Sequence, residues 1–210
     1  MDYNEWEPLY KKILKDFGYN EEKDIKAAKV ALDISKNLTI ASINELRKII
    51  KKKIVTVCGA AMDDEDIKKI DGIVIAADET TSFLLRKGII PDIITTDLDG
   101  NINDLIKANE NGSITIIHAH GDNIDIIKKW LTKFNGKVMI TTQSKPFDIV
   151  YNFGGFTDGD RAYCIAKHFE AKKINLIGFN FEEPKPKSGK KIEIKRKKLK
   201  WAKKIITILK

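Results

Sequence analysis

The sequence is poor in cysteine, in histidine and in long apolar runs, and each shortage argues against one class of protein or binding site. Its two cysteines, Cys58 and Cys164, form no CxxC or other ligand-type pair, which indicates a reduced cytoplasmic thiol state. It has no run of about 18 apolar residues, so we expect no transmembrane helix and no membrane partner. The N-terminus lacks the basic and apolar regions of a secretory signal. We therefore predict a cytoplasmic protein.

What the sequence does contain is charge, together with enough apolar material for a core. Of the 210 residues, 42% are hydrophobic and 32% are charged, and the net charge is +8. Much of the positive excess lies between Lys185 and Lys204. A basic chain can bind nucleic acid, membrane phosphates or a small anionic substrate, so the charge alone leaves the class of partner open.

Residues 1–52 are predicted to form a helical segment ahead of the main domain. Apolar side chains recur at helical spacing from Trp6 to Phe17, and Gly18 follows where helices commonly end. Further helices are expected over residues 21–37 and 43–52. Residues 53–210 would then form an α/β domain that closes with an extended arm at residues 182–188 and an amphipathic helix.

From residue 53 onward, short apolar runs alternate with helical patterns. Runs that are apolar throughout and alternate with helices are typical of a parallel sheet covered on both faces. We therefore predict an α/β fold with a mostly parallel sheet of about six strands. The expected strands are Ile54–Val57, Ile73–Ala76, Ile93–Thr95, Ile114–His118, Val138–Thr142 and Ile174–Ile177.

Polar and glycine-rich residues follow nearly every predicted strand. Gly59 follows the first strand, Asp78 and Thr81 follow the second, and Gln143 follows the fifth. Ligands of open parallel sheets bind beyond the carboxyl ends of the strands, so these residues are expected to converge there. We predict that Gly59 and Thr81 contact a bound cofactor and that Gln143 contacts the substrate.

The sharpest chemical signal is a pair of carboxylates two residues apart, Asp97 and Asp99, directly after the third predicted strand. Magnesium prefers oxygen ligands, and on ATP phosphates it neutralises charge that builds during phosphoryl transfer. The alternative is that Asp97 caps a helix and Asp99 belongs to a turn. Asp78 and Asp122 at equivalent strand ends favour the metal interpretation, although Asp78 could also cap the next helix or bind a ribose.

Two histidines, His118 and His120, form a His-x-His pair of the kind that can bind zinc. The third histidine of the chain, His168, is predicted to lie in a helix without an acidic or thiol partner nearby. Contact with a phosphate of the cofactor therefore fits this pair better than zinc binding. For His118, a structural role in the core fits equally well.

A predicted helix begins at Thr157, and its first residues include Asp158, Gly159 and Arg161. Free N–H groups at the start of a helix bind anions, and a guanidinium is a forked donor suited to phosphate. We therefore predict that these four residues bind the cofactor. A surface pair between the aspartate and the arginine is the alternative.

Two aromatic residues flank a glycine pair just before this helix. Phe153 and Phe156 could stack on the flat ring of a substrate, and they could equally belong to the core. We predict them as substrate-binding residues. The lysines from Lys195 to Lys204 are expected to form a solvated helix face, from which some could reach phosphates.

The order of these motifs resembles the archaeal 6-hydroxymethyl-7,8-dihydropterin pyrophosphokinases and, more distantly, the thiamine pyrophosphokinases. The resemblance covers about residues 45–210, and the His-Ala-His-Gly-Asp-Asn form of one motif favours the pterin enzymes. Glu79 departs from the pattern, because the related enzymes often have glycine there. The motifs are Ala77-Asp78, residues 88–100, residues 118–123 and residues 155–162.

The resemblance implies a thiamine-pyrophosphokinase-like fold and transfer of pyrophosphate from ATP to a hydroxymethyl-dihydropterin, with AMP as the other product. Asp78, Asp97, Asp99 and Asp122 would hold Mg²⁺ on the phosphates, and Asp97, Asp99 and Asp122 would be catalytic. Either Asp97 or Asp122 could accept the hydroxyl proton.

The resemblance also implies a homodimer. The thiamine reaction is the nearest alternative activity, and related sugar-nucleotide domains are another. Nucleic acid is not the expected partner, because aspartates at the strand ends would repel its phosphates in the absence of a metal.

Overall fold

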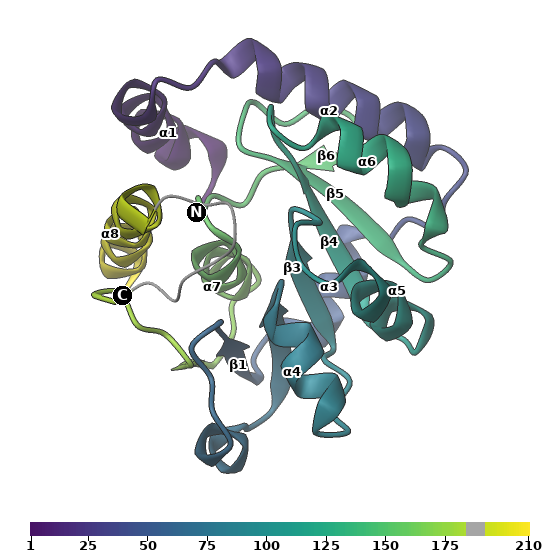
Figure 1. Cartoon of the computed structure of the whole chain (residues 1–210), viewed down its shortest axis with the longest axis vertical. Helices are drawn as coiled ribbons and strands as arrows, with labels where there is room; N and C mark the ends of the chain where they lie inside the picture. The colour runs from purple at the N-terminus through teal and green to yellow at the C-terminus, as the bar shows by residue number, and fades with distance from the viewer. Residues whose placement is uncertain (184–191) are drawn as a thin grey trace.

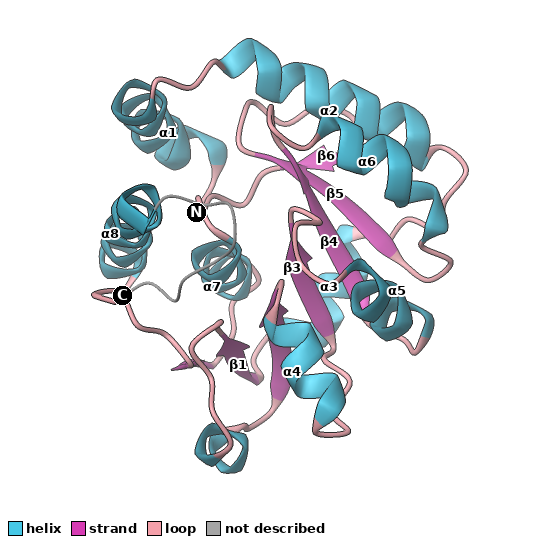
Figure 2. Cartoon of the chain, viewed as in Figure 1, coloured by secondary structure: helices cyan, strands magenta, loops and turns pink. Residues whose placement is uncertain are grey.

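The computed structural model describes residues 1–183 and 192–210, and within this part helices cover both faces of a central sheet (Figure 1, Figure 2). The strands are β1 (Ile54–Cys58), β2 (Ile73–Ala77), β3 (Ile93–Thr96), β4 (Ile114–Ala119), β5 (Val138–Thr142), β6 (Val150–Tyr151) and β7 (Lys173–Ile177). The α-helices are α1 (Tyr3–Phe17), α2 (Glu21–Ser35), α3 (Ile43–Ile50), α4 (Thr80–Arg86), α5 (Ile102–Glu110), α6 (Ile124–Trp130), α7 (Asp158–His168) and α8 (Ile192–Leu209). Two short 3₁₀ helices, Glu65–Lys69 and Leu131–Lys133, complete the described elements.

All strand pairs of the sheet are parallel, in the order β6-β5-β4-β3-β2-β1-β7. The chain adds β1 to β6 one after another and then returns through α7 to place β7 beside β1. The carboxyl ends of all strands therefore share one edge. The predicted α/β class and parallel sheet are confirmed, but the described residues form seven strands rather than about six. The strand that the sequence analysis missed, β6, has two residues, too few to show a hydrophobic pattern.

Each face of the sheet carries its own hydrophobic core. On one face, α2, α5 and α6 bury residues such as Ala28, Leu105 and Ile127 against β3, β4 and β5. On the other face, α3 and α7 pack on the sheet through Leu46, Ile165 and their neighbours. Burial on both faces explains why the strands are apolar along their whole length. The N-terminal helices α2 and α3 thus contribute to the same cores as the later elements.

The helix α1 forms as its sequence predicts. Asp2 and Glu5 make a capping box at its start, and Gly18 ends it with a left-handed backbone (φ 67°) that a side chain would disfavour. Trp6 and Tyr10 are fully buried in a cluster that also includes residues of α7 and α8. The turn between α1 and α2 is therefore held beside the carboxyl edge of the sheet.

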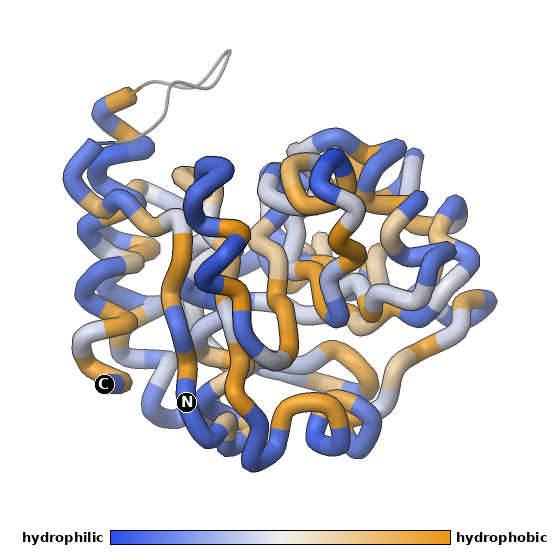
Figure 3. The backbone as a smooth tube through the Cα atoms, turned by 90° about the horizontal axis from the view of Figure 1, so that it is seen from below, coloured by the Kyte–Doolittle hydropathy of each residue, from blue (hydrophilic) through white to orange (hydrophobic). Residues whose placement is uncertain are grey.

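The last helix, α8, packs beside α1 and α7, and Ala202 and Ile206 of its predicted apolar face are buried (Figure 1). Along the outer helices polar and apolar residues alternate, as expected for elements with one face on the core (Figure 3). The arm predicted over residues 182–188 lies, from residue 184 onward, outside the described residues. Within the described ranges, no helix combines the length and the apolar character needed to span a bilayer.

Candidate active site

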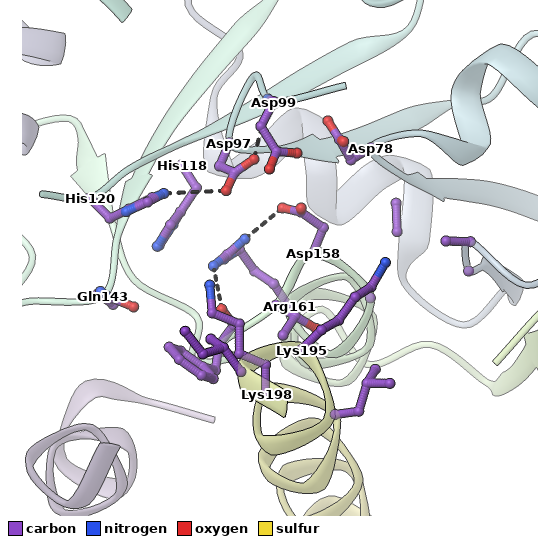
Figure 4. Close-up of a pocket in the computed structure, with 18 of the residues that line it drawn as sticks. Asp78, Asp97, Asp99, His118, His120, Gln143, Asp158, Arg161, Lys195 and Lys198 are labelled. Atoms are coloured by element: carbon purple, nitrogen blue, oxygen red, sulfur yellow. Dashed lines mark hydrogen bonds and ion pairs between the residues drawn. The ribbon is translucent and has the colours of Figure 1, made fainter. Parts of the chain in front are cut away.

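A cavity of about 620 Å³ opens at the carboxyl edge of the sheet. Its floor is made by the residues that follow β1 to β5 and β7, and its walls come from the start of α7, the α1–α2 turn and the first turns of α8. Figure 4 shows that side chains from these separate elements point into one space. The convergence that the sequence predicts at the strand ends is therefore realised in the fold.

Three carboxylates approach each other on one side of the cavity. Asp78 follows β2, Asp97 follows β3 and Asp158 begins α7, and one oxygen from each lies within 4.8 Å of the others. Asp99 lines the cavity beside them. Burial raises the pKa of Asp158 well above its usual range, and the negative charges of Asp97, Asp78 and Asp99 act in the same direction, opposed by Arg161. Like charges at this spacing repel unless a cation lies between them.

The backbone that presents these carboxylates has an unusual conformation. Asp78 (φ 42°) and Leu98 (φ 67°) both have left-handed backbones, which cost energy in residues other than glycine. One hydroxyl stabilises both loops, because Thr96 donates to Asp78 Oδ1 and accepts from the N–H of Leu98 at 2.8 Å. Gly100 is required next to them, since a Cβ there would lie 2.6 Å from Asp78 Oδ2. The strain is thus concentrated where the carboxylates converge.

Asn123 connects the acidic loop to the histidine loop. Its side-chain amide donates to the carbonyl oxygens of Asp97 (2.9 Å) and His118 (2.7 Å), and its oxygen accepts the N–H of His120 (3.0 Å). The ring of His120 then lies with Nε2 3.3 Å from Asp97 Oδ2. The motif from 118 to 123 therefore fixes the position of Asp97 as well as its own histidines.

A cationic group faces the carboxylates from α7. Arg161 is 4% exposed, and it donates to Asp158 Oδ1 at 2.8 Å and to the carbonyl of Phe156 at 3.3 Å. The Nε–H group of Arg161 has no hydrogen-bond partner among the described residues. The N–H of Thr157 donates to Asp160 at 2.8 Å, so this part of the predicted anion-binding helix start is satisfied within the protein.

His118 lies on the floor of the cavity. Its Nδ1 is 3.1 Å from the hydroxyl of Thr141, and its buried Nε2 has no partner among the described residues. Burial lowers the pKa of His118 well below its usual range, and the charges of Arg161 and His120 add to this effect. A neutral imidazole on a cavity floor can exchange hydrogen bonds with a ligand without adding charge.

Comparisons with known proteins identify the family of the chain. The profile of the family described as 6-hydroxymethylpterin diphosphokinase MptE-like matches residues 29–186. The chain belongs to this family. The resemblance inferred from the order of the motifs is thereby confirmed.

Two archaeal relatives are similar to this family member over almost their whole length. The 6-hydroxymethyl-7,8-dihydropterin pyrophosphokinase of Pyrococcus furiosus is 42% identical over 100% of this chain and 95% of its own length. The protein of the same name from Methanocaldococcus jannaschii is 39% identical over 100% of this chain and 96% of its own length. A solved structure, the MAf glycosyltransferase from Magnetospirillum magneticum AMB-1, superposes with a TM-score of 0.49 at 15% identity, covering 90% of this chain and 34% of that one.

In this MptE-like chain, most of the predicted site residues line the cavity. The residues brought together there are Gly59, Asp78, Asp97, Asp99, His118, His120, Asp122, Gln143, Phe156, Thr157, Asp158, Gly159 and Arg161. Asp122 differs from the other aspartates, because it is exposed on its loop and stands outside the group of three converging carboxylates. Asp158, predicted to bind the cofactor rather than the metal, belongs to that group instead.

Two predicted residues are not among the described residues that line the cavity. Thr81 is fully buried in α4, with a hydroxyl that has no partner among the described residues. Phe153 is 4% exposed and packs on Phe169 at a ring-centroid distance of 5.3 Å, within one of the sheet cores. Of the two roles considered for Phe153, the structure shows the core position.

Sequence reasoning missed several residues that line the cavity of this family member. Phe179 and Phe181 follow β7, the one predicted strand whose trailing residues were not considered. A Cβ on Gly159 would lie 2.8 Å from the Phe179 ring, so the start of α7 rests on this aromatic side chain. Asp24, from α2, was missed because a lone aspartate on a helix carries no motif.

Proposed function

We propose that this chain transfers a diphosphate group from ATP to the hydroxymethyl group of 6-hydroxymethyl-7,8-dihydropterin, with Mg²⁺ as the metal and AMP as the second product. The observation that carries the proposal is the convergence of Asp78, Asp97 and Asp158 opposite Arg161 in one cavity. The relatives that bear this activity in their names match the full chain, which supports the same acceptor. The cavity volume of about 620 Å³ lies within the range of small-molecule sites.

The donor atoms of the acidic group fit magnesium. They are carboxylate oxygens from three elements, and hard divalent cations prefer oxygen ligands. Burial and the neighbouring carboxylates raise the pKa of Asp158 despite its pairing with Arg161, and a divalent cation would offset this repulsion. Asp78, Asp97 and Asp158 would hold the metal, with Asp99 beside them. When bound, the metal would shield the phosphate charge that grows during transfer.

The chemistry requires little more than positioning. The hydroxymethyl oxygen forms a bond to the β-phosphorus of ATP, the bond from that phosphorus to the α–β bridging oxygen breaks, and AMP leaves. Arg161 is paired with Asp158 beside the carboxylates, and its Nε–H has no partner among the described residues, so it would also pair with phosphate oxygens. The hydroxyl proton needs an acceptor, and we assign it to Asp97 rather than to the exposed Asp122, because His120 lies 3.3 Å from Asp97 and can share the proton.

The products of the purified protein test this proposal directly. With ATP, MgCl₂ and the reduced hydroxymethylpterin, chromatography of the nucleotides should show AMP forming in equal amount to a pterin diphosphate. Chelation of the metal by EDTA should stop the reaction, and excess Mg²⁺ should restore it. ADP as the only product, or no turnover in the presence of Mg²⁺, would refute the proposal. Thiamine in place of the pterin is the matched control, and faster AMP release with thiamine would assign the other acceptor.

A further inference from the structure

The cavity extends beyond the acidic group toward β4 and β5, where the α1–α2 turn closes it. This end, which we term the amide end, is lined by Gln143 after β5, by Asp24 of α2 and by His118 near the end of β4. Strands lie ~4.8 Å apart, so β5 is about 10 Å from β3 and its carboxylates. A bicyclic ring can bridge that separation. If the phosphates occupy the acidic end, the amide end is free for one of the two substrates.

A closed hydrogen-bond network fixes the amide end. Asp24 Oδ1 accepts the backbone N–H of Gly121 at 2.8 Å, and its Oδ2 accepts both the Tyr10 hydroxyl (2.6 Å) and Gln143 Nε2 (2.9 Å). The indole N–H of Trp6 donates to the backbone carbonyl of Gln143 at 2.8 Å. Asp24 and Gln143 are 4% and 5% exposed, so these bonds exchange little with solvent. The N-terminal helices therefore set the position of both the main chain and the side chain of Gln143.

This network determines which amide atom a ligand meets. A carboxylate oxygen can only accept hydrogen bonds, so the group of Gln143 that lies 2.9 Å from Asp24 Oδ2 must be the NH₂ donor. The amide oxygen of Gln143 is then directed into the cavity, as Figure 4 shows. None of the described residues donates a hydrogen bond to it. A fixed acceptor is therefore presented to whatever binds at this end.

An acceptor at this place discriminates between the two substrates. At the end of the ring remote from the hydroxymethyl carbon, a pterin carries a 2-amino group next to the ring N3–H, so two adjacent donors can face one acceptor. The amino group of adenine lies between ring nitrogens that accept, so its edge needs a donor and an acceptor together. His118 also lines the cavity, and its Nε2, which has no partner among the described residues, offers a second polar contact to a ligand.

We propose, on the basis of the function proposed above, that Gln143 is the residue that selects the pterin, by accepting a hydrogen bond from its 2-amino group, and that Asp24 is the positioning residue that orients the Gln143 amide. The acidic end then takes the phosphates and the amide end takes the ring. The hydroxymethyl carbon, on the opposite side of the ring from the amino group, points to the carboxylates.

A pair of ligands that differ at a single position tests this selection. Titration calorimetry compares 6-hydroxymethylpterin with its 2-oxo counterpart, in the presence of Mg²⁺ and α,β-methylene ATP, which cannot be cleaved. The native protein should bind the 2-amino compound at least about tenfold more tightly than the 2-oxo compound, because it gains one hydrogen bond. In Gln143→Met, whose side chain has a similar length, this ratio should fall close to one. An unchanged ratio in this variant would overturn the proposal.

Asp24→Asn tests the positioning role with a change of preference rather than a loss. The Gly121 N–H requires an oxygen, so the amide nitrogen introduced on α2 must face Gln143, and the Gln143 amide must turn over. Its NH₂ group would then enter the cavity, and the preference should move toward the 2-oxo compound. The double variant Asp24→Asn with Gln143→Glu should restore the 2-amino preference, because the glutamate offers one oxygen to the introduced asparagine and one to the ligand. A merely structural role would give weaker binding of both ligands at an unchanged ratio and no rescue.

Asp33→Asn provides the matched control, because Asp33 lies on the same helix but is exposed and pairs with Lys36. The Asp33→Asn variant should keep the native ratio of affinities for the 2-amino and 2-oxo compounds. Because binding is read without turnover, the two proposals can fail separately. If AMP forms normally but the ratio of the two affinities is the same with and without Gln143, only the selection mechanism is rejected. Absence of both pterin binding and AMP formation in the native protein would reject the function as well.

Discussion

The two ends of the cavity differ in how their polar groups are balanced. At the acidic end, converging carboxylates repel one another, and Asp78 and Leu98 have strained backbones. At the amide end, Asp24 and the NH₂ group of Gln143 have their partners inside the protein, and the Gln143 amide oxygen is left for a ligand. The first end concentrates negative charge, whereas the second is preorganised by hydrogen bonds within the protein. Such a contrast suits a transferase that binds phosphate groups, whose charge is redistributed during transfer, at one end and recognises a rigid ring at the other.

The largest effect is expected at the acidic end. Asp97→Asn keeps the shape of the side chain but removes the proposed metal ligand and proton acceptor, so AMP formation should fall on the order of 10³-fold. The melting temperature should change little, because the introduced amide oxygen can still accept the N–H of residue 99. Activity assays and thermal denaturation of the same preparation measure both quantities. A large loss of stability with activity retained would show that Asp97 is structural.

Asp158→Asn should affect activity and stability in opposite directions. Turnover should fall by roughly 10²-fold through weaker metal binding, since even changes around metal ligands cost 10–100-fold. Without metal, the variant should be at least as stable as the native protein. Burial and the neighbouring carboxylates disfavour a charge at this position more than Arg161 favours it, and the introduced amide oxygen can still accept from Arg161. Thermal denaturation with and without Mg²⁺ should therefore show a smaller metal-induced shift. Asp122→Asn is the comparison, and its shift should match that of the native protein because Asp122 is exposed and outside the group.

The acidic end could be predicted from the sequence because its residues follow strands that are easy to recognise. Asp78, Asp97 and His120 each come just after an apolar run, and the topology of a parallel sheet brings such positions together. The parallel sheet followed from the same runs. What the sequence could not show was the return of the chain through α7, which places Asp158 against Asp97 and adds it to the carboxylates.

The amide end could not be predicted, because its contacts join distant parts of the chain. Asp24 is separated from Gly121 by 97 positions and from Gln143 by 119. An aspartate on an amphipathic helix looks like a solvated charge, and only the packing of α2 on the sheet turns it inward. Gln143 was predicted to contact substrate from its place after β5, but the orientation of its amide depends on Asp24. Long-range hydrogen bonds of this kind leave no local pattern.

Removing one donor from the amide network should cost stability rather than turnover. In Tyr10→Phe, Asp24 loses a buried hydrogen bond, and bonds to charged groups contribute about 2 kcal/mol to the free energy of unfolding. Asp24 Oδ2 still accepts from Gln143, so KM for the pterin should change less than about twofold. Urea denaturation and steady-state kinetics measure these effects. Tyr163→Phe is the control with no expected loss, because the Tyr163 hydroxyl makes no hydrogen bond with the described residues. A tenfold rise in KM for the pterin in Tyr10→Phe would mean that the network is looser than the structure indicates.

The smallest effect concerns Thr81, where the sequence predicts a cofactor contact and the structure shows a buried hydroxyl without a partner among the described residues. Thr81→Val keeps the shape and removes a desolvated polar group, so the free energy of unfolding should rise by up to about 1 kcal/mol, with KM for ATP unchanged. Thr96→Val is the same substitution where the hydroxyl bonds Asp78 and the N–H of Leu98, and it should lower both stability and turnover. A higher KM for ATP in Thr81→Val would place α4 in the nucleotide site and extend the acidic end beyond the cavity that the structure outlines.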